Sequence, residues 1–259
     1  MPFKIDFYPE FPHPSKKDFQ EKFENFQKTI SDPAYGFFSV TDNERLATDC
    51  LEIYKKLKKP KNFIHIGIGG SSLGAKMLIQ ALARDVTNFK FIDNIDPETI
   101  SEQLDHLDYR DTLFYIVSKS GKTIETMAAF IIITNWLEKQ GVKPENFKDY
   151  LVCATDSRSG DLRNISRQLQ LHCLDIPANV GGRFSILTAV GLFPSLFADI
   201  DIKELLDGAN NIKKDILKQE NNLLFKTAFF IMELAKQGIN QTVFMPYSSK
   251  LKELSFWMT

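Results

Sequence analysis

Five short apolar runs recur between residues 63 and 174, and stretches with helical spacing of apolar and polar positions separate them. The run from Thr112 to Val117 is almost wholly apolar and ends abruptly, which is typical of a strand buried on both faces. The other four runs are residues 63–68, 89–93, 150–154 and 171–174. Strands that alternate with helices form parallel β–α–β units with right-handed crossovers. The pattern therefore predicts an α/β fold with a doubly wound, parallel five-stranded sheet and helices on both faces.

Further helical patterns lie on either side of this region. Phe19, Phe23 and Phe26 recur at helical spacing within residues 16–30, so we expect them to face a core. The other predicted helices are residues 42–57, 186–197, 201–219 and 222–237. Residues 241–246 predict one more strand, followed by a loop and the start of a helix.

These patterns divide the chain into four parts. They are an N-terminal arm with two helices (1–60), a first α/β domain (61–185), connecting helices (186–238) and the truncated start of a second, similar domain (239–259). The arm opens with four prolines in its first 15 residues, so we expect it to run extended over the surface.

Polar chemistry is concentrated directly after the third predicted strand, in Ser118-Lys119-Ser120-Gly121-Lys122-Thr123. A helix follows, and the unpaired N–H groups and the dipole of a helix N-terminus favour an anion. The three hydroxyls can add donors, and glycine allows close approach of the backbone. An ordinary helix cap is the alternative, but a cap needs one hydroxyl. A nucleotide-binding P-loop is excluded because residue 116, where that pattern needs glycine, is isoleucine. We therefore predict a phosphate site.

The turns after the first and fifth strands carry chemistry that complements this loop. Gly67-Ile68-Gly69-Gly70-Ser71-Ser72 lacks the third glycine of a dinucleotide fingerprint, and its backbone and hydroxyls suit a neutral, hydroxyl-rich ligand. Gly181-Gly182-Arg183 places a cation at a helix start, where the dipole disfavours it, so an anionic ligand explains it best. The alternatives are a tight turn without a ligand and a surface ion pair. Because carboxyl ends of parallel strands share one sheet edge, the three turns predict a site for a phosphorylated polyol.

Acid–base chemistry is sparse near these turns. Glu125, Asp96 and His65 are the available groups. His65 lies within a predicted strand, so we expect it to be packed rather than catalytic.

Bulk properties exclude several other classes of protein. The 259 residues carry a net charge of -1, which gives no broad field for nucleic acid or membrane surfaces. The three cysteines form no pairing pattern, the four histidines show no metal-ligand spacing, and no apolar run approaches the length of a membrane span. The first residues lack the charged-then-apolar pattern of a signal peptide. We expect a soluble cytoplasmic protein without a metal site.

Three motifs in order resemble the phosphoglucose isomerase family, whose fold is the sugar isomerase (SIS) domain. They are the glycine turn (residues 66–74), the hydroxyl loop (118–126) and the arginine turn (180–185), and Asn94-Ile95-Asp96 fits the segment between the first two. The hydroxyl loop recurs across SIS domains, whereas the glycine and arginine motifs together are specific to this family. The resemblance covers residue 40 to the end of the sequence.

The resemblance implies a reaction and roles for individual residues. The reaction would interconvert glucose 6-phosphate and fructose 6-phosphate, a step of glycolysis and gluconeogenesis, through a cis-enediolate and without a cofactor. Ser118, Ser120 and Thr123 would hold the phosphate, with Lys119 also in the substrate site. The sugar would lie against Gly70 and Ser71, and Arg183 would be the catalytic group that stabilises the enediolate charge.

Two departures from the family pattern qualify this expectation. Lys122 stands where the family commonly has a small hydroxyl residue, and it can strengthen phosphate binding or point to solvent. In the family, the catalytic glutamate lies in a later segment, and residues 248–259 resemble only the approach to that segment, so no proton-shuttling base can be assigned. We expect a fragment that is close to inactive alone, and a homodimer for the full-length enzyme. The alternatives are a non-catalytic SIS-type module that binds a sugar phosphate, and an amino-sugar isomerase domain, which the arginine turn disfavours.

Overall fold

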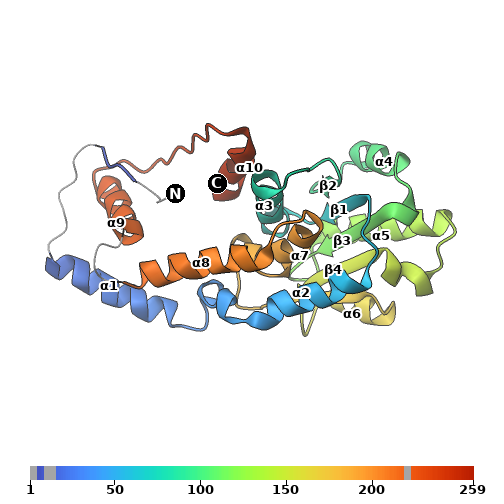
Figure 1. The fold of residues 1–259 in the computed structure, drawn as a ribbon, viewed down its shortest axis with the longest axis horizontal. Coiled ribbons are helices and arrows are strands. Elements are labelled where there is room, and N and C mark those ends of the chain that lie inside the picture. Colours follow the sequence, from blue (N-terminus) through green and yellow to red (C-terminus); the bar gives the residue numbers. More distant parts are fainter. Residues whose placement is uncertain (1–4, 9–15, 219–222) are drawn as a thin grey trace.

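A computed structural model describes residues 5–8, 16–218 and 223–259, and its core is one parallel sheet (Figure 1). The five strands are β1 (Asn62–Ile66), β2 (Phe89–Ile92), β3 (Thr112–Val117), β4 (Leu151–Asp156) and β5 (His172–Ile176). Their order across the sheet is β2-β1-β3-β4-β5, and every pair is parallel. All six residues of β3, the central strand, are buried, as the apolar run predicted. The predicted α/β fold class is thus confirmed.

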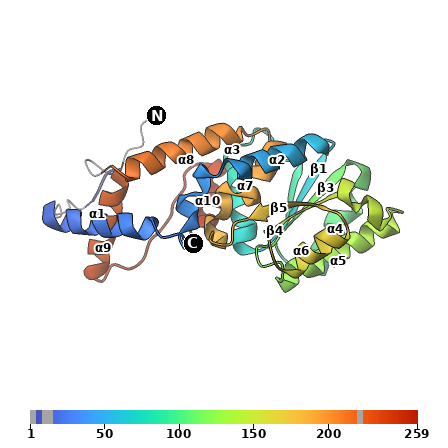
Figure 2. The ribbon, with the colours of Figure 1, turned by 90° about the horizontal axis from the view of Figure 1, so that it is seen from below.

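Two layers of helices enclose the sheet because successive side chains of a buried strand point to opposite faces. One face packs against α2 (Glu44–Lys56) and α7 (Ala189–Phe197), with α3 (Leu73–Leu82) beside α7. The other face packs against α4 (Pro97–Asp105), α5 (Ile124–Lys139) and α6 (Asp161–Gln168). Figure 2 shows the two layers on either side of the sheet.

The neighbouring strands β1 and β3 send their chains to opposite layers. β1 continues into α3, whereas β3 continues into α5. This reversal between β1 and β3 is the topological switch point of a doubly wound sheet, where the turns after two adjacent strands diverge and leave room for a ligand.

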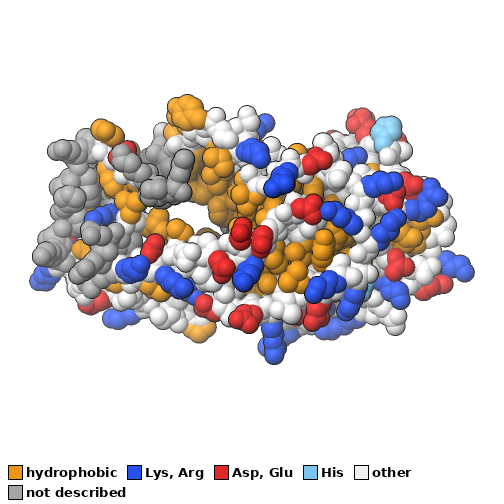
Figure 3. Space-filling view, in the orientation of Figure 1, with side chains coloured by type: hydrophobic (Ala, Val, Ile, Leu, Met, Phe, Trp, Pro, Cys, Tyr) orange, Lys and Arg blue, Asp and Glu red, His pale blue; other side chains and the backbone are white. Residues whose placement is uncertain are grey.

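A second, smaller unit lies away from the sheet, at the left of Figure 1. The long helix α8 (Ile202–Ile216) leads from the sheet towards it, and α1 (Lys16–Ile30) packs there against α9 (Leu223–Lys236). The rings of Phe19 and Phe23 lie 4.9 and 5.5 Å from that of Phe225, which confirms that the predicted phenylalanine stripe faces a core. Apolar side chains are also visible on the face shown in Figure 3, over this unit and over the helices that cover the sheet.

The strand predicted at residues 241–246 is wrong. Residues 239–247 have no regular secondary structure, and Val243 and Met245 are 77% and 68% exposed. A strand must exchange main-chain hydrogen bonds with a neighbour, and no described strand lies beside this segment. The helix predicted after it is present as α10 (Lys252–Met258), which packs against α3. The extended arm predicted for residues 1–15 lies almost entirely outside the described residues.

Candidate functional site

The turn after β1 is shaped by a buried histidine. His65 is fully buried in mid-strand, and its Nε2 lies 2.7 Å from the carbonyl oxygen of Ser71. A carbonyl oxygen only accepts, so Nε2 carries the proton and donates it. Burial lowers the pKa of His65 to about 4, which keeps the ring neutral at pH 7. The expectation that His65 is packed is confirmed, and its function in the fold is to fix the glycine turn.

Gly70 brings the glycine turn into backbone contact with the arginine turn. A Cβ built on Gly70 would overlap the Gly182 carbonyl group and lie 2.7 Å from the amide nitrogen of Arg183. The hydroxyl of Ser185, which is buried, lies 2.6 Å from the carbonyl oxygen of Gly182 and 3.3 Å from that of Gly70. The structure therefore joins the turns after β1 and β5, although β3 and β4 lie between those two strands in the sheet.

The hydroxyl loop after β3 presents the uncapped N-terminus of α5. The N-caps of α4, α7 and α8 accept hydrogen bonds from their own helices, whereas the side chain of Thr123 makes no such bond. Its Oγ1 instead accepts from the Ser118 hydroxyl at 3.2 Å. The first N–H groups of a helix have no partner within the helix, so this N-terminus is available to an anion.

Burial separates the three hydroxyls of the loop into two kinds. Ser118 is 1% exposed and lies below the loop, where it orients Thr123. Ser120 is exposed, and its Oγ accepts from the amide of Lys122 at 3.2 Å. Gly121 adopts a φ of +63°, which L side chains rarely adopt. Ser120 and Thr123 are thus placed to reach a ligand, and Ser118 supports them.

The loop after β4 supports the hydroxyl loop from the neighbouring strand, and the sequence did not single it out. The amide of Asp156 donates to the carbonyl of Lys119 at 3.0 Å, and the amide of Leu162 donates to that of Gly121 at 3.1 Å. Gly160, with a φ of +107°, lets the two loops touch, because a Cβ there would lie 2.5 Å from the carbonyl oxygen of Ser120. The signal was present as Asp156-Ser157-Arg158-Ser159-Gly160, a composition typical of a tight turn.

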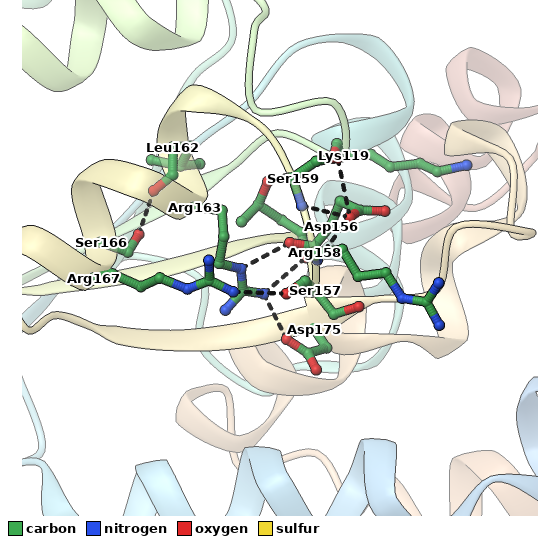
Figure 4. A network of polar contacts seen from close by, with 11 residues as sticks. Lys119, Asp156, Ser157, Arg158, Ser159, Leu162, Arg163, Ser166, Arg167 and Asp175 are labelled. Carbon is green, nitrogen blue, oxygen red and sulfur yellow. Dashed lines mark hydrogen bonds and ion pairs between the residues drawn. The ribbon is translucent and has the colours of Figure 1, made fainter.

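Buried Arg163 fixes this supporting loop (Figure 4). Its Nε donates to the carbonyl of Asp156 at 2.8 Å, and its Nη2 pairs with the Asp175 carboxylate at 2.5 Å. The Asp156 carboxylate accepts from the amides of Arg158 and Ser159, and these bonds lower its pKa. The guanidinium therefore ties the ends of β4 and β5 together beneath the hydroxyl loop.

Lys119 points away from the hydroxyl loop. Its ammonium donates to the carbonyl oxygen of Ala178 at 2.6 Å, just before the arginine turn, and to that of Val180 at 2.7 Å, the first residue of the turn. The place of Lys119 in the substrate site stays a prediction. In the structure its ammonium group bonds to two main-chain carbonyls.

Arg183 lies at the surface of the arginine turn. Its side chain is exposed, and within residues 16–218 and 223–259 no carboxylate forms an ion pair with it. The next residue, Phe184, stacks on Phe37 with ring centroids 4.6 Å apart. An arginine on a fixed turn without an internal carboxylate partner can meet an anionic ligand.

The acid–base candidates lie at different places. Asp96 is exposed and caps α4, accepting from the amides of Glu98 and Thr99. Glu125 lies half-buried in the first turn of α5. Among the described residues, no group of three or more His, Cys, Asp or Glu side chains could hold a metal ion. No helix in the described ranges is long and apolar enough to cross a membrane.

Comparison with known proteins agrees with this arrangement. A sequence model described as phosphoglucose isomerase matches residues 53–259. The chain is 39% identical over 198 residues to a glucose-6-phosphate isomerase of Thermus thermophilus, covering 76% of this chain and 47% of the relative. It is 34% identical over 248 residues to a glucose-6-phosphate isomerase of Methanocaldococcus jannaschii, covering 94% of this chain and 58% of the relative. The chain thus spans about half the length of the curated relatives it matches.

Solved structures show the same fold. The structure of a hypothetical protein from Thermus thermophilus matches 93% of this chain and 58% of its own, with a TM-score of 0.85 and 33% identity. A glucose-6-phosphate isomerase from Chlamydia trachomatis matches 84% of this chain and 43% of its own, with a TM-score of 0.72 and 27% identity. The glycine turn, the hydroxyl loop and the arginine turn all lie inside the region that the sequence model matches. Sequence and fold together show that this chain belongs to the phosphoglucose isomerase family.

Proposed function

We propose that this chain provides the sugar-phosphate-binding half of an enzyme that interconverts glucose 6-phosphate and fructose 6-phosphate. The observation that carries the proposal is the meeting of three turns at one sheet edge: Gly70 touches the arginine turn, and Lys119 joins that turn to the hydroxyl loop. Relatives that are 34–39% identical to this chain bear the name glucose-6-phosphate isomerase.

The phosphate would bind at the N-terminus of α5. Ser120 and Thr123 would donate hydroxyl hydrogens to it, and Ser118 would orient Thr123 from below. The α5 dipole, which develops over the 16 residues of the helix, favours the anion at this end. The sugar would extend from there towards Gly70 and Ser71.

Arg183 would act on the other end of the substrate. Moving a proton between C1 and C2 of the sugar passes through an enediolate, whose oxygens carry the charge left by the abstracted proton. A fixed guanidinium stabilises that charge more than it stabilises the neutral carbonyl of the substrate, which lowers the barrier. The described residues do not identify the base: the pKa of His65 and its bond to Ser71 hold it neutral inside the sheet, and Asp96 caps a helix.

The remaining features of the proposal concern the longer protein. We propose that it is a cytoplasmic homodimer, that it needs no cofactor, and that residues 239–259 begin a second SIS-type domain. The second candidate function is that of a non-catalytic module that binds a sugar phosphate. We retain it because no base can be assigned among the described residues.

Calorimetric titration with fructose 6-phosphate tests the proposal. Ser120→Ala and Thr123→Val each remove a donor to a charged phosphate, so each is expected to weaken binding about tenfold or more. Thr134→Val is the matched control, because Thr134 lies on the same helix and its hydroxyl bonds only to backbone carbonyls. Equal affinity in all four proteins, or no binding at all, would contradict the phosphate site.

A turnover assay then separates the two candidate functions. Conversion of fructose 6-phosphate to glucose 6-phosphate is followed by NMR with the 259-residue chain and with the longer protein. Turnover by the longer protein alone supports the isomerase half, whereas binding without turnover by either supports the module. Competition with glucosamine 6-phosphate tests the amino-sugar alternative, which predicts the tighter binding of that sugar.

A further inference from the structure

The position of the arginine turn depends on contacts with elements other than β5, the strand that precedes it. β5 ends at Ile176, and Arg183 follows seven positions later. Such a segment would be mobile unless other elements held it. Since an arginine that stabilises charge must be fixed before the reaction, the contacts that fix this turn belong to the catalytic apparatus.

Three elements hold the turn from different sides. On the first side, Gly70 and Ser185 join it to the glycine turn. On the second, Asn179 bonds to the carbonyl of Pro33, and Phe184 stacks on Phe37. Lys119, from the hydroxyl loop, forms the third.

Lys119 is firmly anchored at its backbone. Its carbonyl accepts from the amide of Asp156 at 3.0 Å and lies 3.4 Å from the hydroxyl of Thr155. Its side chain crosses from the end of β3 over β4 to the carbonyls of Ala178 and Val180. One residue thus links three adjacent strand ends.

The two carbonyl contacts are charge-assisted hydrogen bonds, the stronger class. Val180 is fully buried, so its carbonyl would lose a partner that water replaces poorly if the ammonium were removed. An ammonium group has three donors, and these two carbonyls occupy two of them, so at most one is left for a bound phosphate. The geometry therefore favours a structural partner over a ligand.

We propose that Lys119 is a positioning residue that ties the arginine turn to the hydroxyl loop, so that an anion held by the loop also fixes Arg183. The coupling rests on the proposed function, since it needs a ligand at the loop, whereas the tether itself does not. Lys119→Met keeps the length of the side chain and removes the donor. Lys122→Met is the matched control, because it removes the same charge from the same loop, and no carbonyl of residues 178–180 bonds to Lys122 in the described structure.

Hydrogen exchange measured by mass spectrometry gives the first readout, without ligand. Peptides covering residues 177–187 are expected to exchange about tenfold faster or more in Lys119→Met, and at the unaltered rate in Lys122→Met. Lys119→Arg, which keeps a cationic donor, is expected to restore part of the protection. Equal exchange of residues 177–187 in Lys119→Met and the unaltered chain would overturn the tether.

Fructose 6-phosphate and inorganic phosphate give the second readout. In the unaltered chain, either ligand is expected to slow exchange in residues 118–127 and also in residues 177–187. In Lys119→Met the first effect is expected to persist and the second to vanish. If the substitution instead abolishes protection of residues 118–127 and leaves the arginine turn unchanged, Lys119 is a direct ligand and the proposal is wrong. If the ligands protect neither segment of the unaltered chain, the proposed function fails, and the ligand-free comparison alone decides the tether.

Discussion

The contact at Gly70 makes a sharp prediction because its two sides are unequal. A Cβ on Gly70 would overlap the Gly182 carbonyl and lie 2.7 Å from the amide nitrogen of Arg183, whereas a Cβ on Gly182 would lie 3.7 Å from Cα of Gly70. The first position has no room for a methyl group, and the second has ordinary van der Waals spacing. Gly70→Ala must therefore push the arginine turn away from the glycine turn.

The size of the effect follows from the obstructing atoms, which are backbone and cannot rotate away. Overpacking of this kind costs about 1–3 kcal/mol, and a cost of about 2 kcal/mol would lower the melting temperature by about 4–8 °C in a chain of this size. Displacement of a reacting group by about 1 Å can cost about 100-fold in rate, so Gly70→Ala is expected to impair a site that uses Arg183 much more than it impairs folding.

Thermal denaturation followed by circular dichroism checks the effect on stability, and the turnover assay of fructose 6-phosphate with the longer protein checks the effect on rate. Gly182→Ala is the control, and its stability is expected to change by less than about 0.5 kcal/mol. Equal melting temperatures for the two variants would refute the reasoning, since the asymmetry of the contact is its only basis.

Three further predictions concern buried groups. The lowered pKa of His65, about 4 against 6.5, means that the unfolded state binds the proton more readily, so this histidine contributes stability that is complete above pH 6.5 and is lost as the pH falls towards 4. Urea titrations at pH 7 and pH 4 measure how much the free energy of unfolding falls between these two pH values. In His65→Phe this fall is expected to be smaller by about 3 kcal/mol, and an unchanged pH dependence would contradict the prediction. Burial raises the pKa of the Cys153 thiol to about 12, and it also raises the pKa of Cys50. At pH 8 a disulfide reagent is therefore expected to label only Cys173, which is half-buried, in the native chain. Rapid labelling of all three cysteines would be inconsistent with this burial. Arg163→Met is expected to cost about 1–3 kcal/mol in urea denaturation, because it leaves the Asp156 carbonyl without its partner, and a loss below about 0.5 kcal/mol would show that the loop after β4 is held by other bonds.

The sheet could be predicted from the sequence because its signals are local. Apart from Thr112, the six residues of β3 form an apolar run, and the predicted and observed strands coincide there. The turns after β1 and β3 begin directly at Gly67 and Ser118, and the arginine turn follows the last strand, so their common edge followed from parallel topology alone.

The sequence could not show which residues far apart along the chain are hydrogen-bond partners. The sequence predicts that Lys119 is a cation of the hydroxyl loop. Its hydrogen-bond partners are main-chain carbonyls 59 and 61 residues away, and a main-chain carbonyl cannot be recognised from the type of its residue. The strand expected at residues 241–246 failed for a related reason. Its apolar residues predict a half-buried strand, but a strand is defined by the neighbour that pairs with it, and sequence pattern does not reveal whether one is present.

The link between Asn179 and Pro33 has a consequence for the order in which the chain is assembled during synthesis. These residues are 146 positions apart, and β5 is the last strand of the sheet and lies at its edge. Domains fold as units while the chain leaves the ribosome. Residues 33–37 therefore wait without their docking partner until β5 and the arginine turn have been made. The arginine turn is completed last, because it needs both the final strand and this early segment.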